Sequence, residues 1–130
     1  MPGVDNSITL LQSRITDFQA RIDPKEKQIA LKVNLSAQYK KVLDEKELRG
    51  IIRIQAIISG EEKDEFYISA TDELTFGFDE EPLDFDQTMN TECLAVAVQD
   101  VSNKIDGILD AMGNPKLNLA SSIPAQPTRE

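Results

Sequence analysis

The residues of this chain that could do chemistry are a single cysteine, Cys93, and a group of acids near position 80. A cysteine reacts as its thiolate, and the chain holds no histidine that could activate it. Cys93 also lies in an apolar stretch, so we interpret it as a buried structural residue. The acids could bind a hard cation, but they lack the alternating ligands and central glycine of a calcium loop. We therefore expect a solvated approach to a helix and no metal site. The acids are Asp79, Glu80, Glu81, Asp84 and Asp86.

The absence of histidine also removes the Ser-His-Asp triad, the Cys-His pair and the imidazole base from the available mechanisms. The glycines are scattered singly, so no phosphate-binding loop is formed and no cofactor is expected. We expect a protein that is not an enzyme. A small histidine-free enzyme is the least favoured alternative, and a deep pocket holding a carboxylate of strongly raised pKa would revive it.

The formal charge of −9 and the pI of about 4.5 limit the classes of partner that the protein can bind. An acidic surface repels phosphate backbones and anionic membranes, so we expect neither nucleic acid nor a membrane surface as a partner. Basic or apolar polypeptides remain. The first residues lack the basic flank and apolar stretch of a secretory signal, and no run is long enough to span a bilayer. With one cysteine, and so no internal disulfide, a cytoplasmic location is expected.

The first part of the chain predicts strand. Residues 8–23 alternate loosely and predict a long, bent strand, although Leu11 breaks the alternation and a helix over 7–21 is the competing interpretation. Asp23-Pro24-Lys25 predicts a turn, because proline fixes its own φ and pushes the preceding residue out of the helical region.

Three further runs also predict strands. Residues 28–36 alternate cleanly and predict a half-buried strand, and the charged stretch 39–46 reads as a connection. Residues 47–59 give the strongest strand pattern, and residues 65–78 return as another strand after a turn at Gly60. Short turns between alternating runs favour an antiparallel meander.

A helix is predicted from about Phe85 to Met112, ended by Gly113 in the left-handed region and by Pro115. The predicted fold is therefore α+β, with a four-stranded antiparallel sheet packed on one long helix. We expect one domain over residues 1–120 and a mobile tail over 121–130.

The run Leu94-Ala95-Val96-Ala97-Val98 leaves no polar face in that part of the helix. A helix that is apolar all round needs cover on more than one side, and one small sheet cannot provide it. We therefore expect a homo-oligomer, a dimer or a dimer of dimers. The predicted interface stripe is Leu94, Val98, Val101, Ile105, Ile108 and Met112.

Apolar side chains gather where the last strand gives way to the helix. They could be core, or they could line a groove, since aromatic residues beside a loop proline are common in binding sites. Core is the default for Phe76, and the two interpretations are close to even for Leu83 and Phe85. The candidate binding residues are Phe76, Phe78, Leu83, Phe85 and Leu119.

The segment from Asp110 to Ala120, with its glycine, proline and Leu-Asn-Leu-Ala sequence, resembles the segment after the long helix of the protein-export chaperone SecB. The hairpin at 57–62, leading to Phe66 and Thr75-Phe76-Gly77-Phe78, looks like the third and fourth strands of that family. The resemblance implies a dimer of dimers with long helices between two sheets, and a groove that binds unfolded clients. It also implies docking of the SecA motor on an acidic sheet face.

The chain departs from the SecB pattern in two ways. It ends in a proline-bearing tail where the family has a second helix that helps to wall the client groove. Around Asp17, the residues Arg21, Tyr67 and Ser69 do not reproduce an acidic patch. The favoured hypothesis is an ATP-independent holdase for unfolded or pre-export polypeptides. One alternative is a chaperone dedicated to one client such as an antitoxin. The other is a structural adaptor subunit, in which a fixed partner would cover the apolar surfaces.

Overall fold

The computed structural model describes residues 8–22, 31–45, 47–60, 66–119 and 128–129. Four long strands form one antiparallel sheet: β1 (Ile8–Ile22), β2 (Lys32–Asp44), β3 (Glu47–Ser59) and β4 (Phe66–Phe78). The strand order is β1-β4-β3-β2, and a short β5 (Thr128–Arg129) pairs in parallel with β2 at the end of the sheet. The predicted α+β architecture is confirmed. The predicted meander holds for β2, β3 and β4 but is wrong for β1, which pairs with β4 and not with β2.

The bend predicted for β1 has its origin in two bulges. Its pairing with β4 skips one residue between Leu10 and Gln12 and another between Ile15 and Asp17. Leu11 and Thr16 are therefore the additional residues. Leu11, which breaks the sequence alternation, is an extra residue in a strand rather than a sign of the competing helix.

The connection predicted over 39–46 is wrong, because β2 continues to Asp44. Inward-facing Tyr39 is only 4 % exposed and pairs with Ile52 of β3. A charged sequence can form this strand because β2 lies near the edge of the sheet, where polar side chains reach solvent. Residues 23–30, with the predicted turn and the start of the predicted strand 28–36, lie outside the described residues.

Strand β3 has the predicted bounds, and β4 begins one residue inside the predicted range, since residues 61–65 are not described. Their inward faces supply most of the core, and each fully buried aliphatic side chain contributes about 1.5–3 kcal/mol. The largest fully buried hydrophobic side chains on these strands are Ile52, Ile54, Ile58, Ile68, Leu74 and Phe76.

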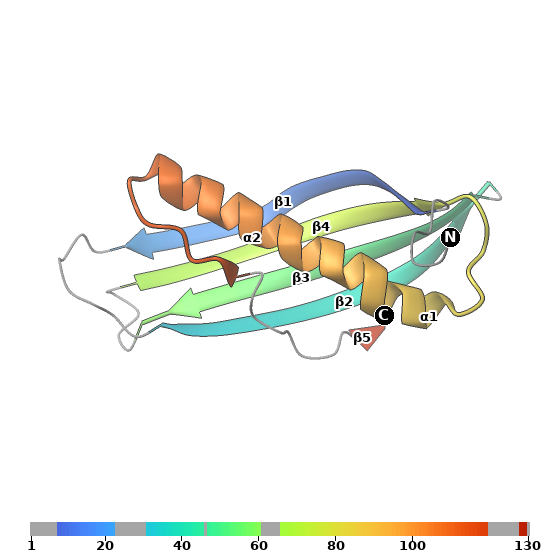
Figure 1. Ribbon diagram of the computed structural model, residues 1–130, viewed down its shortest axis with the longest axis horizontal. Coiled ribbons are helices and arrows are strands. Elements are labelled where there is room, and N and C mark those ends of the chain that lie inside the picture. Colours follow the sequence, from blue (N-terminus) through green and yellow to red (C-terminus); the bar gives the residue numbers. More distant parts are fainter. Residues whose placement is uncertain (1–7, 23–30, 46, 61–65, 120–127, 130) are drawn as a thin grey trace.

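One helical rod follows β4, in three parts: α1 (Phe85–Thr88), a π-helical turn η1 (Met89–Cys93) and α2 (Leu94–Ala111). Figure 1 shows it crossing one face of the sheet diagonally, from the β2 side at α1 to the β1 side at its C-terminal end. Cys93 is 1 % exposed, which confirms its interpretation as a buried structural cysteine.

Two glycines shape this helix: one lets it approach the sheet, and the other ends it. A Cβ on Gly50 of β3 would lie 2.6 Å from Sδ of Met89, so the helix approaches the sheet where the side chain is missing. Gly113 has a φ of 81°. Its N–H donates to the carbonyl of Asp110, and the Asn114 N–H donates to the carbonyl of Leu109. This is the predicted left-handed helix end.

Thr128 and Arg129, within the tail expected to be mobile, form the short strand β5. The remaining tail residues, 121–127 and 130, lie outside the described residues, so mobility there stays a prediction.

Candidate functional site

The aromatic residues proposed as binding residues are buried in this chain. Phe76 is 1 % exposed and lies beneath the helix, while Phe78 and Phe85 are each 8 % exposed. The rings of Phe78 and Phe85 lie 5.7 Å apart, and Tyr39 lies 6.4 Å from Phe85. These contacts anchor α1 on β2 and β4. A bound polypeptide could reach these rings only by displacing the helix.

Leu119 is also buried, at 3 % exposure. The carboxylate of Asp106, on α2, accepts hydrogen bonds from the backbone N–H groups of Leu117 at 2.8 Å and Asn118 at 3.3 Å. Asn118 adopts a φ of 59°, which turns the chain back toward the sheet. The Leu-Asn-Leu segment is therefore folded against the core by one helix carboxylate.

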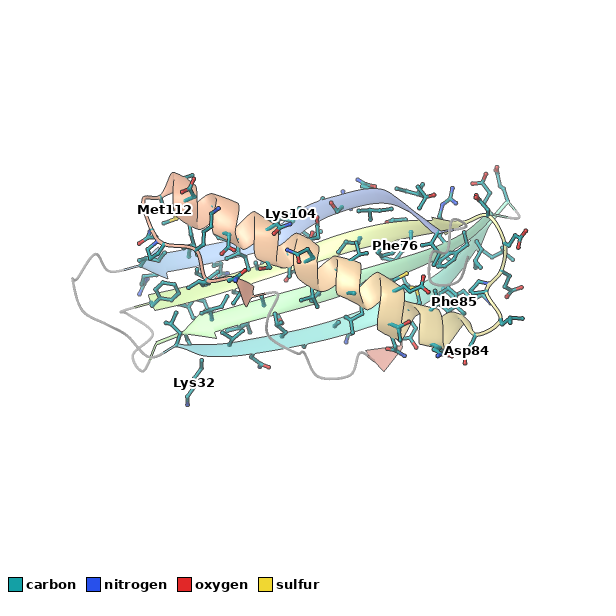
Figure 2. The ribbon with its side chains drawn as sticks, in the orientation of Figure 1. Lys32, Phe76, Asp84, Phe85, Lys104 and Met112 are labelled. Carbon is teal, nitrogen blue, oxygen red and sulfur yellow. The ribbon has the colours of Figure 1, made fainter. Side chains whose placement is uncertain are left out.

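Leu83 is the one candidate that the structure leaves open, with its side chain fully exposed at 110 % of the reference area. It lies in the crossover segment, residues 79–84, which joins β4 to α1. The ammonium of Lys41 lies 2.9 Å from Oε1 of Glu81, and Oδ1 of Asp84 accepts a hydrogen bond from the N–H of Gln87 at 3.0 Å. Both sides of Leu83 are thus tied to the folded body, and Figure 2 shows Asp84 at the start of the helix.

A second exposed apolar residue lies close along the chain to the same ion pair. Leu43 is 71 % exposed and comes two residues after Lys41, as Leu83 comes two residues after Glu81. Leu43 pairs with Leu48, and Leu48 pairs with Phe78 at the end of β4, where the crossover segment begins. We call Leu43, Leu83 and the acids beside them the crossover end. Its exposed acids are Glu45, Glu47, Asp79, Glu80, Glu81 and Asp84.

Sequence reasoning missed Leu43 because it fell in the stretch interpreted as a connection. The signal was present, since Tyr39, Lys41 and Leu43 continue the alternation of β2. At the inward position between them, Lys41 places its ammonium 5.4 Å from the centre of the Phe85 ring, a cation–π contact.

The predicted interface stripe divides between two environments. Val98 is 8 % exposed, and Val101 and Ile105 are fully buried against the sheet of their own chain. Leu94 and Ile108 are half-buried, and Met112 is 49 % exposed at the far end of α2. This places half of the stripe in the monomer core.

The outward side of the apolar run is formed by Ala95 and Val96. Both are exposed, Val96 to 41 %. The sheet therefore covers only one side of this run, as the sequence indicated. A second copy as the remaining cover stays a prediction.

A buried charge that sequence reasoning missed lies between the helix and the sheet. Asp72 of β4 is fully buried, and its Oδ1 accepts a hydrogen bond from Nζ of Lys104 at 2.9 Å. The same Nζ lies 2.9 Å from Oδ2 of Asp100 and 3.1 Å from Oγ of Ser13. Alternation along β4 places Asp72 on the inward face, and that signal could have found it.

The electrostatics of this cluster follow from burial and from two carboxylates sharing one ammonium. Desolvation raises the pKa of Asp72 to about 7, with the Asp100 carboxylate adding to the rise and Lys104 opposing it. The pKa of Asp100 is lowered: burial alone would raise it, but the neighbouring Asp72 and Lys104 groups outweigh that effect. Because Asp72 is fully buried beneath α2, its raised pKa reflects packing and gives no sign of a substrate site.

The sheet face opposite the helix does not present an acidic surface at its centre. There Glu73 of β4 lies 3.6 Å from Arg14 of β1 and 3.2 Å from Arg53 of β3, so two guanidinium groups flank one carboxylate. Both arginine side chains are more exposed than that of Glu73. The acidic docking face implied by the resemblance is absent from this row of described residues.

Among the described residues, no group of His, Cys, Asp and Glu side chains could hold a metal ion. No helix within the described ranges is long and apolar enough to cross a membrane.

The architecture is similar to that of a solved protein from Mycobacterium tuberculosis, the SecB-like chaperone Rv1957 in complex with a ChAD peptide from the antitoxin Rv1956 HigA1. The two structures align with a TM-score of 0.65 over 85 % of this chain and 84 % of that chain. The fold is SecB-like. Because the sequences share only 8 % identity, this similarity is one of fold alone. Neither a family model nor a curated protein sequence matches the chain.

Proposed function

We propose that this protein is an ATP-independent chaperone of the holdase type, which binds unfolded or partly folded polypeptides at the crossover end. The observation that carries the proposal is Leu83, a fully exposed apolar side chain held in a braced acidic segment. The SecB-like fold supports it, because the similar Mycobacterium tuberculosis protein was solved with a peptide bound. A partner that binds only unfolded chains keeps them from aggregating by mass action and needs no cofactor.

The geometry fits loose recognition of apolar segments. Leu83 loses little conformational freedom on binding, because Glu81 and Asp84 already hold the segment on either side. The surrounding acids favour basic client segments and keep a loaded complex soluble. Burying two leucine side chains such as Leu43 and Leu83 contributes about 3–6 kcal/mol at most, which corresponds to weak binding.

Weak single sites gain from repetition. Several crossover ends in one homo-oligomer would bind one unfolded chain at several points and raise the affinity without any new contact. We therefore keep the predicted dimer or dimer of dimers as part of the proposal. The exposed outward residues Ala95 and Val96 of α2 are candidates for the contact between copies.

The test is suppression of aggregation of several unrelated unfolded proteins at near-stoichiometric ratios, measured by light scattering. We expect the wild-type protein to suppress it and Leu83→Ser to lose most of that effect. Val33→Ser is the matched control, since Val33 is 40 % exposed and its neighbour Lys32 lies at the other end of the sheet from Asp84 (Figure 2). Equal suppression by Leu83→Ser and wild type would contradict the assignment of the crossover end.

The main alternative is a chaperone dedicated to one client, and the antitoxin peptide bound by the similar protein gives it a precedent. An adaptor with a fixed partner is the second alternative. A pull-down from native cytosol separates them, since a general holdase retains many proteins and a dedicated chaperone or adaptor retains one. Delivery of clients to a SecA-like motor has the least support, because Arg14 and Arg53 flank the Glu73 carboxylate in the central row of the opposite sheet face.

A further inference from the structure

The cluster beneath α2 has an imbalance of charge. It contains two carboxylates, Asp72 and Asp100, and one ammonium, Lys104. When all three groups are ionised the cluster carries one net negative charge, at a site where the Asp72 side chain has no solvent contact. Burying an uncompensated charge is costly, and one bound proton would neutralise the cluster.

The cluster also has buried carboxylate oxygens that could share a proton. Oδ2 of Asp72 and Oδ2 of Asp100 are both buried without a hydrogen-bond partner among the described residues. Nζ of Lys104 lies 2.9 Å from Oδ2 of Asp100, and Oδ1 of Asp72 accepts from Lys104, so Oδ2 of Asp72 is the oxygen without a nearby cation. A proton on Oδ2 would turn this unsatisfied acceptor into a donor to the carboxylate of Asp100. The bound proton therefore neutralises the net charge of the cluster and gives Oδ2 of Asp72 a hydrogen-bond partner.

No other charge on the packed elements competes for this role. On β1 and β3 the residues that pair directly with Asp72 are Ile15 and Ile54, which are apolar. From β1, Ser13 contributes a neutral hydroxyl to Lys104. The charged groups that act on Asp72 within the described part of the chain are Asp100 and Lys104, both on α2.

We propose that Asp72, Asp100 and Lys104 form a proton-binding site that couples the docking of α2 on the sheet to pH. The protonated cluster holds the middle of α2 on β4, and the ionised cluster loosens it and opens the apolar sheet face beneath. This device belongs to the fold and does not depend on the proposed chaperone function.

The sign of the coupling follows from the two states of Asp72. The unfolded or opened chain has the ordinary pKa of 3.8, and the docked chain holds the proton up to about pH 7. Stability from this group is therefore complete below about pH 4 and is lost as the pH rises to about 7. For one linked proton, the opening constant of α2 rises about tenfold per pH unit within that window.

The experiment measures the carboxyl carbon shift of Asp72 by NMR, with hydrogen exchange of α2 amides corrected for intrinsic rates, between pH 5 and pH 9. We expect Asp72 to titrate near neutrality in the wild-type protein, and the pH dependence of α2 opening to disappear in Asp72→Asn. Asp100→Asn should move the midpoint to lower pH, and Lys104→Met should move it to higher pH. Asp110→Asn, an exposed acid on the same helix, should leave it unchanged.

Titration of Asp72 near its ordinary pKa would overturn the proposal. So would parallel profiles of α2 opening in the wild-type protein and Asp72→Asn. If Asp72→Asn does not fold, the Asp100→Asn and Lys104→Met variants still test the proposal. Opposite shifts of the Asp72 titration midpoint in these two variants would support the site, and shifts in the same direction would reject it.

Discussion

The ammonium of Lys104, on α2, lies 2.9 Å from Oδ1 of Asp72, on β4, across the interface between helix and sheet. Asp72 has no solvent contact in this pair, whereas the Lys104 side chain is 27 % exposed. The pair ties the long helix to the centre of the sheet, and Figure 2 shows Lys104 on the β1 side of the helix. Polar contacts of this kind fix where a helix sits on an apolar sheet surface, which would otherwise tolerate sliding.

Removing the lysine alone should be more damaging than removing the pair. Lys104→Met leaves Asp72 buried without its cation, and we expect a loss of about 3 kcal/mol in the free energy of unfolding at pH 8. The loss should be smaller at pH 6, where Asp72 holds a proton. Asp72→Leu combined with Lys104→Met should recover part of the stability, because no buried charge remains.

Urea unfolding followed by circular dichroism measures these differences, with the exposed Lys116→Met as the control. A double variant less stable than Lys104→Met alone would show that the ion pair itself, and not the relief of a buried charge, dominates.

Gly50 should accept alanine only at a cost in stability while Met89 is present. In Gly50→Ala the new Cβ would lie 2.6 Å from Sδ and 2.9 Å from Cε of Met89, with Cε2 of Phe78 at 3.1 Å. We expect a cost of about 1–3 kcal/mol, because Met89 is fully buried and must move within a packed interface. Adding Met89→Val should make the Gly50→Ala cost smaller than it is in the wild-type background. Additive effects in this double-mutant cycle would mean that the two residues do not touch.

The fold could be predicted where local pattern and tertiary environment agree. β3 keeps strict alternation because both its neighbours are strands and one face lies under the helix, so its bounds match the prediction. Lys41 shows where pattern fails: a lysine on the inward face marked the segment as a connection, yet its ammonium packs over Phe85. The local sequence of β2 gives no sign of this contact, because Phe85 lies 44 positions later in the chain.

The candidate site could be predicted only in part. The helix stripe indicates which residues are apolar but not which side of the helix the sheet covers. The sequence alone therefore cannot separate Val98 and Val101, which the sheet of their own chain buries, from residues that contact a second copy. Phe85 and Leu83 lie two residues apart with similar hydrophobicity. Their opposite exposure depends on the helix start at Asp84, which turns one side chain inward and leaves the other outside.

Gly107 and Gly113 should respond to alanine in opposite directions. A Cβ on Gly107 has nothing within 4 Å, and the residue lies inside α2, so Gly107→Ala should stabilise the fold by about 0.5–1 kcal/mol. Gly113 has a φ of 81°, so Gly113→Ala should destabilise it by about 1 kcal/mol. Thermal unfolding of both variants at low protein concentration gives the two signs. A lower melting temperature for Gly107→Ala would indicate that a partner packs closely against this point of the helix.

Substitutions of the two valines in the apolar run test the core and the contact between copies separately. Val98 is 8 % exposed against the sheet, so Val98→Asp buries an unpaired charge and should unfold the chain or cost several kcal/mol. Val96 is 41 % exposed on the outward side, so Val96→Asp should keep the circular dichroism spectrum and the melting temperature of the isolated subunit. If a second copy covers that side, the same variant should reduce the molar mass measured by light scattering, because the charge would be buried between helices.

Ser36→Asp is the control for added charge, since Ser36 is polar already and exposed on β2, away from the outward side of α2. A wild-type protein that is monomeric at micromolar concentration would remove the need for a covering copy. In that case Ala95 and Val96 would be an exposed apolar surface of the single chain, available to clients in the same way as Leu83. Loss of aggregation suppression in Val96→Asp without a change in molar mass would then identify the outward side of α2 as a second client contact.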